Sequence, residues 1–214
     1  TVSIGRDGRG SGVVIAPASL QLAVRNTATF TGSGGVEPYT FSIADGAGSV
    51  DAASGLFTAP DAPGVVLVRV TDAASHSADA VVTVNAALTI SPTSKTVPVG
   101  AGTTFAAAGG VTPYVFSMVS GGGSISSAGA YVTGGTPGSE RVRVTDARGN
   151  TAEAEVTVVP AVTISPTMKI VDVGGTVAFT ASGGVPPYVY SLFAGAGGRL
   201  LAHLHPPAPP RLVA

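Results

Sequence analysis

Two aspartates at matching places in the sequence are the residues best suited to chemistry. Asp72 and Asp146 each follow a Val-Thr pair, and Asn150 lies four residues beyond the second. Hard cations such as calcium need several converging oxygens, so these three side chains are the calcium candidates. The alternative is a turn in which each aspartate accepts hydrogen bonds from its own backbone. We favour the turn, because no dense acidic cluster surrounds either aspartate and because His76 stands where the second copy has Asn150.

The other reactive side chains form no catalytic constellation. His203 and His205 have metal-ligand spacing, but no third ligand lies near them in the sequence. No serine lies in a nucleophile motif, and the absence of cysteine excludes thiol catalysis, disulfides and thiolate metal sites. No helical pattern follows the glycine-rich stretches at 32–35 and 121–123, so they predict turns and not phosphate-binding loops. The sequence predicts no enzyme and, apart from the calcium alternative, no cofactor.

The charge pattern excludes several kinds of partner. Eleven Lys and Arg balance twelve Asp and Glu, and no basic stripe is present to neutralise a nucleic-acid backbone. Arg69, Arg141 and Arg143 lie on the outward face of predicted strands. They could bind an anion, but we favour a role in solubility and in protecting a sheet edge. No apolar run approaches the roughly 18 residues of a membrane-spanning helix, so no membrane span is predicted.

A ten-residue motif recurs three times along the chain. It reads GGVEPYTFSI at 34–43, GGVTPYVFSM at 109–118 and GGVPPYVYSL at 183–192, which is a spacing of 75 and then 74 residues. A fixed period of this kind indicates tandem modules.

Within each module the apolar residues alternate with polar ones. Residues 66–71 and 140–145 show this period of two most clearly, with Val inward and Arg outward. About seven short strands separated by turn signals, with no helical period, predict an all-β sandwich. Burying one large side chain stabilises a fold by roughly 1.5–3 kcal/mol. The predicted core aromatics are Phe30, Tyr39, Phe41, Phe105, Tyr114, Phe116, Phe179, Tyr188 and Tyr190.

The period also predicts the domain boundaries. We expect a remnant of a preceding module at 1–14, complete modules at 15–86 and 87–160, an incomplete module at 161–197 and an aberrant Pro-rich tail at 198–214. The joints between modules are about three residues long, which favours an elongated array. The chain opens within a module and carries no targeting sequence, so we expect a fragment or a processed product.

The tail departs abruptly from the repeat. The segment SISSAGAY at 124–131 should recur at 198–205, where the sequence is instead GRLLAHLH, followed by PPAPPRLVA. Our hypothesis is a change of reading frame or an early stop, and a disordered Pro-rich tail describes the same residues. The third module would then have an unpaired sheet edge.

The chain resembles the bacterial immunoglobulin-like (Big-type) repeats of secreted and surface proteins. The resemblance covers about residues 15–197 and rests on four features, which are the TISP segments, the Gly-Gly-x-x-Pro-Tyr motif, the GLFTAP segment at 55–60 and the VTDA turn. It implies tandem immunoglobulin-like β-sandwich modules in an elongated arrangement. Unlike antibody domains, the chain has neither Cys nor Trp, so aromatic pairs must fill the core.

The function implied by the resemblance is structural or adhesive. We expect a non-catalytic spacer of a bacterial surface or secreted protein, located extracellularly or at the cell surface. Its partners would be neighbouring immunoglobulin-like modules and a protein or glycan at a cell surface. The alternative is a carbohydrate-binding accessory of a secreted hydrolase, which would need exposed aromatic side chains on one face. The fold by itself does not decide between them.

Overall fold

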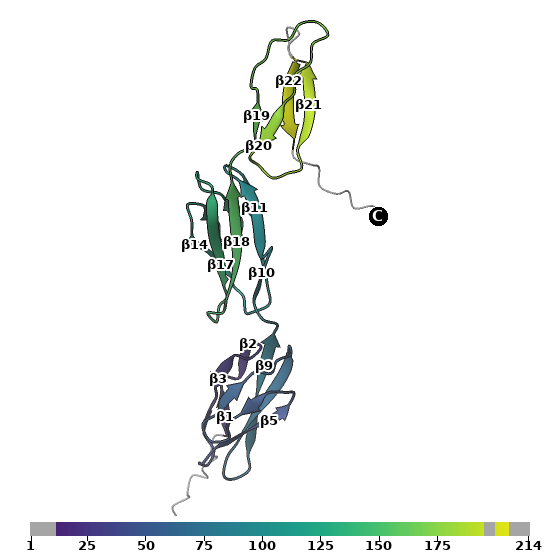
Figure 1. The fold of residues 1–214 in the computed structure, drawn as a ribbon. Coiled ribbons are helices and arrows are strands. Elements are labelled where there is room, and N and C mark those ends of the chain that lie inside the picture. Colours follow the sequence, from purple (N-terminus) through teal and green to yellow (C-terminus); the bar gives the residue numbers. More distant parts are fainter. Residues whose placement is uncertain (1–11, 195–199, 206–214) are drawn as a thin grey trace, which may run out of the picture. The chain divides into compact units, whose positions relative to one another are not determined.

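The computed structural model describes residues 12–194 and 200–205 (Figure 1). Most of the predicted remnant at 1–14 lies outside this range. The chain divides into two compact units. The first comprises Thr1–Thr89, Ala107–Tyr114 and Thr145–Thr151, and the second comprises Ile90–Ala106, Val115–Val144 and Ala152–Ala214. No described residue lies in a helix that could cross a membrane.

The first module contains nine short strands arranged in antiparallel and parallel pairs. One sheet has the strand order β2-β9-β8-β5, a second has the order β3-β7-β6, and β1 pairs with β4. The strands are β1 (Val14–Ala16), β2 (Ser19–Ala23), β3 (Thr27–Thr29), β4 (Thr31–Ser33), β5 (Thr40–Asp45), β6 (Ser49–Val50), β7 (Leu56–Thr58), β8 (Gly64–Thr71) and β9 (Ser77–Asn85). The first of these strands, β1, begins at Val14. The all-β prediction is confirmed.

The strands on either side of Phe30 belong to the two smaller sheets. β3 and β4 are separated only by this residue, whose N–H donates to the carbonyl of Gly55. The ring of Phe30 packs edge-on against Phe57 of β7, with 6.2 Å between ring centroids. From the opposite sheet, alternate residues of β8 and β9 complete a core cluster. Its fully buried valines include Val66, Val68, Val70 and Val82.

The second module repeats this plan. Its sheets have the orders β11-β18-β17-β14 and β12-β16-β15, and β10 pairs with β13. The strands are β10 (Thr89–Ser91), β11 (Ser94–Pro98), β12 (Gly102–Thr104), β13 (Ala106–Ala108), β14 (Val115–Ser120), β15 (Ser124–Ile125), β16 (Ala130–Val132), β17 (Gly138–Thr145) and β18 (Thr151–Val159). Phe105 and Tyr131 form the edge-on aromatic pair, at 6.0 Å.

A proline separates the first two strands of each complete module. β1 ends before Pro17 and β2 begins after it, and Pro92 divides β10 from β11 in the same way. Both prolines follow cis peptide bonds. Because proline has no N–H to donate, the strand breaks there and the two halves pair with different sheets.

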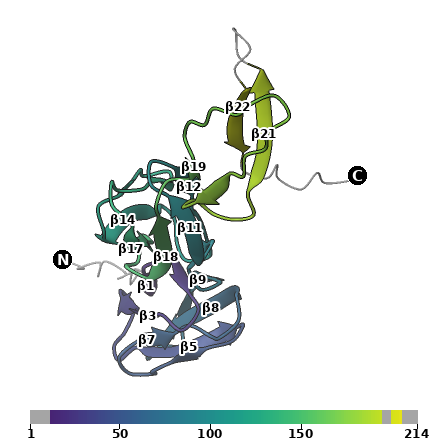
Figure 2. The same cartoon turned by 45° about the horizontal axis from the view of Figure 1, so that its top comes forward.

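The third module has four strands among the described residues. They are β19 (Thr163–Ser165), β20 (Thr180–Ser182), β21 (Val189–Ala194) and β22 (Leu200–His205). β19 pairs with β20, and β21 pairs antiparallel with β22, beside which it lies in both Figure 1 and Figure 2. Residues 200–205, which belong to the predicted Pro-rich tail at 198–214, thus form a strand. Backbone pairing with the edge of β21 needs no repeat sequence, only free N–H and C=O groups.

Candidate functional site

The carboxylate of Asp72 binds two loops at one end of the first module. Its Oδ1 accepts hydrogen bonds from the backbone N–H groups of Ala74 and His76, at 3.0 and 2.8 Å, within the β8–β9 turn. Its Oδ2 accepts from the N–H of Val36, at 3.0 Å, in the glycine-rich motif, and lies 3.1 Å from Nδ1 of His76. The side chain therefore closes its own turn and also anchors the loop before β5.

In the second module, Asp146 likewise closes its own turn and anchors the glycine-rich motif. Its Oδ1 accepts from the N–H groups of Arg148 and Asn150, both at 2.9 Å. Its Oδ2 accepts from the N–H of Val111 and from Nδ2 of Asn150, both at 2.8 Å. Asn150 thus fills the position that His76 fills beside Asp72.

The hydrogen bonds decide the ionisation of both aspartates, each only 5% exposed. Burial would raise the pKa of Asp72, but the donors from Val36 and His76 together lower that pKa below its ordinary value. Burial likewise opposes ionisation of Asp146, and donors from Asn150, Val111 and Arg148 lower its pKa. Both side chains are therefore ionised hydrogen-bond acceptors at neutral pH.

The second glycine of the ten-residue motif allows the motif backbone to lie close to the aspartate carboxylate. Gly110 has φ +57°, and a Cβ built there would lie 2.5 Å from Oδ2 of Asp146. Gly35 has φ +59° and faces Asp72 in the same way. Residues other than glycine rarely adopt this conformation, and the added carbon would collide with the carboxylate.

The calcium candidates come together only in part. Asp146 and Asn150 are in direct contact, but Asp72 serves its own turn. Oδ1 of Asn150 also accepts a hydrogen bond from Nδ2 of Asn26, at 2.8 Å, so each candidate oxygen already has a protein donor. Within the part of the chain that the structure describes, no three His, Cys, Asp or Glu side chains form a group that could hold a metal ion.

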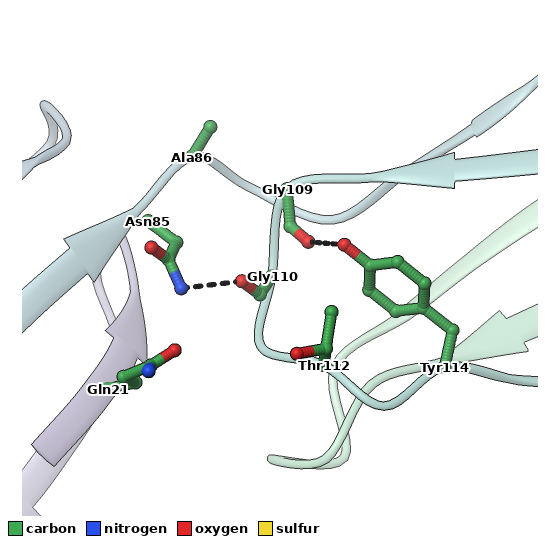
Figure 3. Close-up of a pocket in the computed structure, with 7 residues that line it drawn as sticks. All are labelled: Gln21, Asn85, Ala86, Gly109, Gly110, Thr112 and Tyr114. Atoms are coloured by element: carbon green, nitrogen blue, oxygen red, sulfur yellow. Dashed lines mark hydrogen bonds between the residues drawn. The ribbon is translucent and has the colours of Figure 1, made fainter.

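A shallow pocket of about 330 Å³ lies in the first compact unit (Figure 3). Asn85 donates through Nδ2 to the carbonyl of Gly110, at 2.8 Å, and the hydroxyl of Tyr114 donates to the carbonyl of Gly109, at 2.6 Å. The pocket lining holds no carboxylate, imidazole or amine, and the hydroxyl of Tyr114 is hydrogen-bonded to the backbone. The lining residues are Gln21, Asn85, Ala86, Gly109, Gly110, Thr112 and Tyr114.

The arginines considered for anion binding have acidic partners. Arg69 makes two 2.7 Å hydrogen bonds to Asp79 on the adjacent strand β9. Arg143 binds Glu153, and Arg141 lies 3.5 Å from the same carboxylate. These cross-strand pairs neutralise much of the predicted positive patch.

The predicted core aromatics differ in burial. Phe30, Phe41 and Phe105 are buried. Four others are half-buried, namely Tyr39, Tyr114, Phe116 and Tyr188, and each of the three tyrosines donates its hydroxyl to a motif glycine carbonyl. In the third module Phe179 is half-buried, whereas Tyr190 is 49% exposed and lies outside any core, because few strands cover its sheet.

Sequence reasoning missed a buried polar pair in the second module. Glu140, only 4% exposed, accepts hydrogen bonds from the hydroxyl of Tyr131 at 2.7 Å and from the N–H groups of Gly123 and Gly134 at 2.9 and 3.3 Å. Burial, then the hydrogen bond and the negative charge of Glu140, raise the pKa of Tyr131. Aligning the repeats could have revealed this pair, because both positions change together: the first module has Phe57 and Val66 where the second has Tyr131 and Glu140.

Comparisons with known proteins bear on the fold. No protein-family model and no curated protein matches this chain. A C-terminal 282-residue fragment of intimin, in complex with the intimin-binding domain of the translocated intimin receptor, matches with 18% identity and a TM-score of 0.50. The match covers 72% of this chain and 65% of the intimin fragment, so the chain spans less than two thirds of that fragment.

Two other solved structures match over a similar share of the chain. Domains 4 and 5 of the S-layer protein SbsC match with 17% identity and a TM-score of 0.29, covering 69% of this chain and 96% of that one. Domains EC1–4 of Drosophila N-cadherin match with 12% identity and a TM-score of 0.30, covering 70% and 49%. With the strand topology described above, the intimin match identifies the fold as tandem immunoglobulin-like β-sandwich modules.

Proposed function

We propose that this chain is a non-catalytic spacer of a bacterial surface or secreted protein, built to hold its modules folded under tension. The observation that carries the proposal is the parallel pairing of an early strand with the last strand in both complete modules. β2 pairs with β9 from Ser19↔Val81 to Ala23↔Asn85, and β11 pairs with β18 from Ser94↔Glu155 to Pro98↔Val159.

Parallel pairing determines how a pulling force reaches the backbone hydrogen bonds. Each module's chain enters through β1 or β10, continues past the proline into β2 or β11, and leaves through β9 or β18. Pulling the two ends apart slides the paired strands past each other, so the hydrogen bonds of the ladder are loaded together. An antiparallel terminal pair would instead be opened one bond at a time. Further backbone bonds extend each ladder, such as Val81 N–H to Ala18 and Val24 N–H to Asn85.

The hydrogen-bonded aspartates support the same role. Asp72 and Asp146 are the most chemically distinctive residues of the repeat, and their carboxylates are occupied by bonds that hold two loops together. Such residues stabilise a module without offering a reactive group. The intimin fragment, similar in fold, is in complex with a receptor domain, and we propose a protein partner at a cell surface for this chain as well.

The carbohydrate-binding alternative receives less support. Sugar-binding platforms use exposed aromatic rings. Among the described residues of the two complete modules, every Phe and Tyr is buried or half-buried. The exposed Tyr190 belongs to the third module, where its hydroxyl accepts a hydrogen bond from the N–H of Ala181.

Single-molecule pulling of the full chain by its ends tests the proposal. We expect two force peaks, each releasing up to roughly 250 Å of chain, as 74–75 residues extend at about 3.3–3.6 Å each. Val81→Pro removes the N–H that bonds Ala18 and should lower one peak, while the other module serves as an internal reference. Val81→Thr keeps the N–H and should leave both peaks unchanged. Unfolding without measurable force peaks would contradict the proposal.

A further inference from the structure

One turn recurs in all three modules, after β2 in the first and after β11 in the second. In the first module it spans 23–26, and the N–H of Asn26 donates to the carbonyl of Ala23 at 3.2 Å. The equivalent bonds, at the repeat spacing, are 3.0 and 2.9 Å long and run from Ala101 to Pro98 and from Gly175 to Asp172. Each module therefore has the same backbone hydrogen bond at this point of the repeat.

The third residue of this turn is glycine in two modules and arginine in the first. Gly100 and Gly174 have φ values of +80° and +82°, and Arg25 has +64°. Such turns favour glycine at this place, because a residue with a side chain is strained in the left-handed conformation. The ion pair of Arg25 with Asp61 does not account for the arginine, since both side chains are 78% exposed and exposed pairs contribute little. A strained residue that the turn itself does not require points to a function.

A second arginine reaches the same turn from the segment between β17 and β18. Nε of Arg148 donates to the carbonyl of Gln21 in β2, at 3.0 Å. Close by, Oδ1 of Asn150 accepts a 2.8 Å hydrogen bond from Nδ2 of Asn26. All these residues belong to the first compact unit. The first module has Ala74 where the second has Arg148, so the repeat does not require this arginine either.

The two arginines line one pocket of about 380 Å³ in this unit, together with Leu22, Asn26 and Thr27. The volume lies in the range of about 300–1,000 Å³ that is usual for small-molecule sites. Apart from the Nε bonds to Asp61 and Gln21, the N–H groups of both guanidinium ions have no partner among the described residues. The pocket therefore presents unused donors from two separate turns.

Among the described residues, one of the two positive charges in this pocket lacks an ion-pair partner. Asp61 pairs with Arg25, whereas Arg148 bonds through Nε to a neutral carbonyl. Asp146 lies two residues before Arg148, but it does not line the pocket, and its carboxylate already accepts four N–H groups. The pocket thus suits an anion.

We propose that this pocket binds a tetrahedral oxyanion, a phosphate or sulfate group, held by the guanidinium groups of Arg25 and Arg148. A guanidinium ion presents a planar fork of N–H groups that matches a pair of oxygens. A tetrahedral group offers oxygens to two forks at once, whereas a planar carboxylate is satisfied by one. Asn26 and Thr27 add polar groups to the same lining. This site goes beyond the spacer role and does not depend on it.

The test is an NMR titration of the full, isotope-labelled chain at constant ionic strength. Inorganic phosphate and sulfate should each give saturable shifts of the Nε–H signals of Arg25 and Arg148 and of the backbone amides of Asn26 and Thr27. Acetate should bind more weakly than either. Methyl phosphate distinguishes two sources of the same group. Tighter binding of this ester than of inorganic phosphate indicates a group carried on a larger molecule, and equal binding indicates the free ion; both results support the site.

Two variants take their new residues from the counterpart modules and therefore suit the fold. Arg25→Gly and Arg148→Ala should each weaken phosphate binding by about tenfold or more, because each removes one charged fork. Arg69→Ala is the matched control, since it removes a guanidinium group of the same module that lies outside the pocket. It should bind phosphate as the parent does.

Thermal unfolding without phosphate separates a binding role of Arg25 from a structural one. Arg25→Gly should not lower the midpoint, because glycine adopts the left-handed conformation without strain. A lower midpoint with unchanged phosphate binding would overturn the proposal, as would equal weakening by Arg69→Ala or the absence of saturable phosphate and sulfate binding. None of these measurements applies force, so their failure would leave the spacer proposal to be decided by the pulling experiment.

Discussion

The hydroxyl of Tyr131 donates a 2.7 Å hydrogen bond to the buried carboxylate of Glu140, at the two positions where the first module has the apolar pair Phe57 and Val66. One fold thus accommodates either an apolar or a hydrogen-bonded pair at the same place in its core. The polar version stays buried because Gly123 and Gly134 supply two more donors to Glu140.

This pair predicts coupled effects on the free energy of unfolding. Tyr131→Phe should destabilise the second module by about 1–3 kcal/mol, because it removes a donor from a buried carboxylate. In a Glu140→Val background the same change should be neutral or stabilising, since the phenol then has no partner. A double-mutant cycle by urea unfolding measures the difference. Equal effects in both backgrounds would show that the hydrogen bond contributes nothing.

Removing the second turn aspartate should loosen two loops together. Asp146→Ala deletes four hydrogen bonds and leaves the N–H of Val111 without its acceptor, so we expect a loss of about 3 kcal/mol or more. Hydrogen exchange should show faster exchange at both Val111 and Asn150. Asp45→Ala, which changes an exposed aspartate bonded only to its neighbour Gly46, is the control. Faster exchange at Asn150 alone would mean that the carboxylate does not anchor the motif.

The second motif glycine should tolerate no side chain. Gly110→Ala forces a left-handed conformation that costs about 1–2 kcal/mol for other residues, and the new carbon meets the carboxylate of Asp146. Gly135→Ala in the same module faces open space and serves as the control. Thermal unfolding should show a lower midpoint for the first variant only.

The free energy of unfolding should fall in acid because Asp72 and Asp146 become protonated. Both have folded-state pKa values below their ordinary value, so their contribution is present above the unfolded pKa of about 3.9 and is lost as pH falls through the folded-state pKa. The free energy of unfolding should therefore be flat with respect to these groups above about pH 5 and should decline below about pH 4. In Asp72→Asn/Asp146→Asn the decline should be shallower. An unchanged slope would assign acid sensitivity to other carboxylates.

Calcium should leave thermal stability unchanged. A metal would have to displace the protein donors that already occupy Asp72, Asp146 and Asn150. Thermal unfolding of the full chain with millimolar calcium and with a chelator should give the same midpoints. A higher midpoint in calcium would reveal a site that binds the folded state preferentially, and the three residues would be the first to substitute.

The sequence alone was enough to predict tandem all-β modules, because the period of 74–75 residues and the strict apolar alternation can both be read directly from it. Val66, Val68 and Val70 predicted an inward strand face, and all three are buried. The glycine-rich motif and the VTDA turn were both visible in the sequence. The hydrogen bond that connects them could not be read from the sequence, because Asp72 lies 36 residues from Val36 and meets it only in the folded module.

Tertiary structure decided how each residue type was used. Nothing local distinguishes the buried Glu140 from a surface glutamate, because its hydrogen-bond donors come from Gly123, Tyr131 and Gly134, which only the folded module brings to it. Tyr190 follows the alternation of a core residue yet is exposed, and residues 200–205 depart from the repeat yet pair with β21. Alternation specifies which face of a strand is apolar, but burial requires a covering strand, and backbone pairing requires only an available edge.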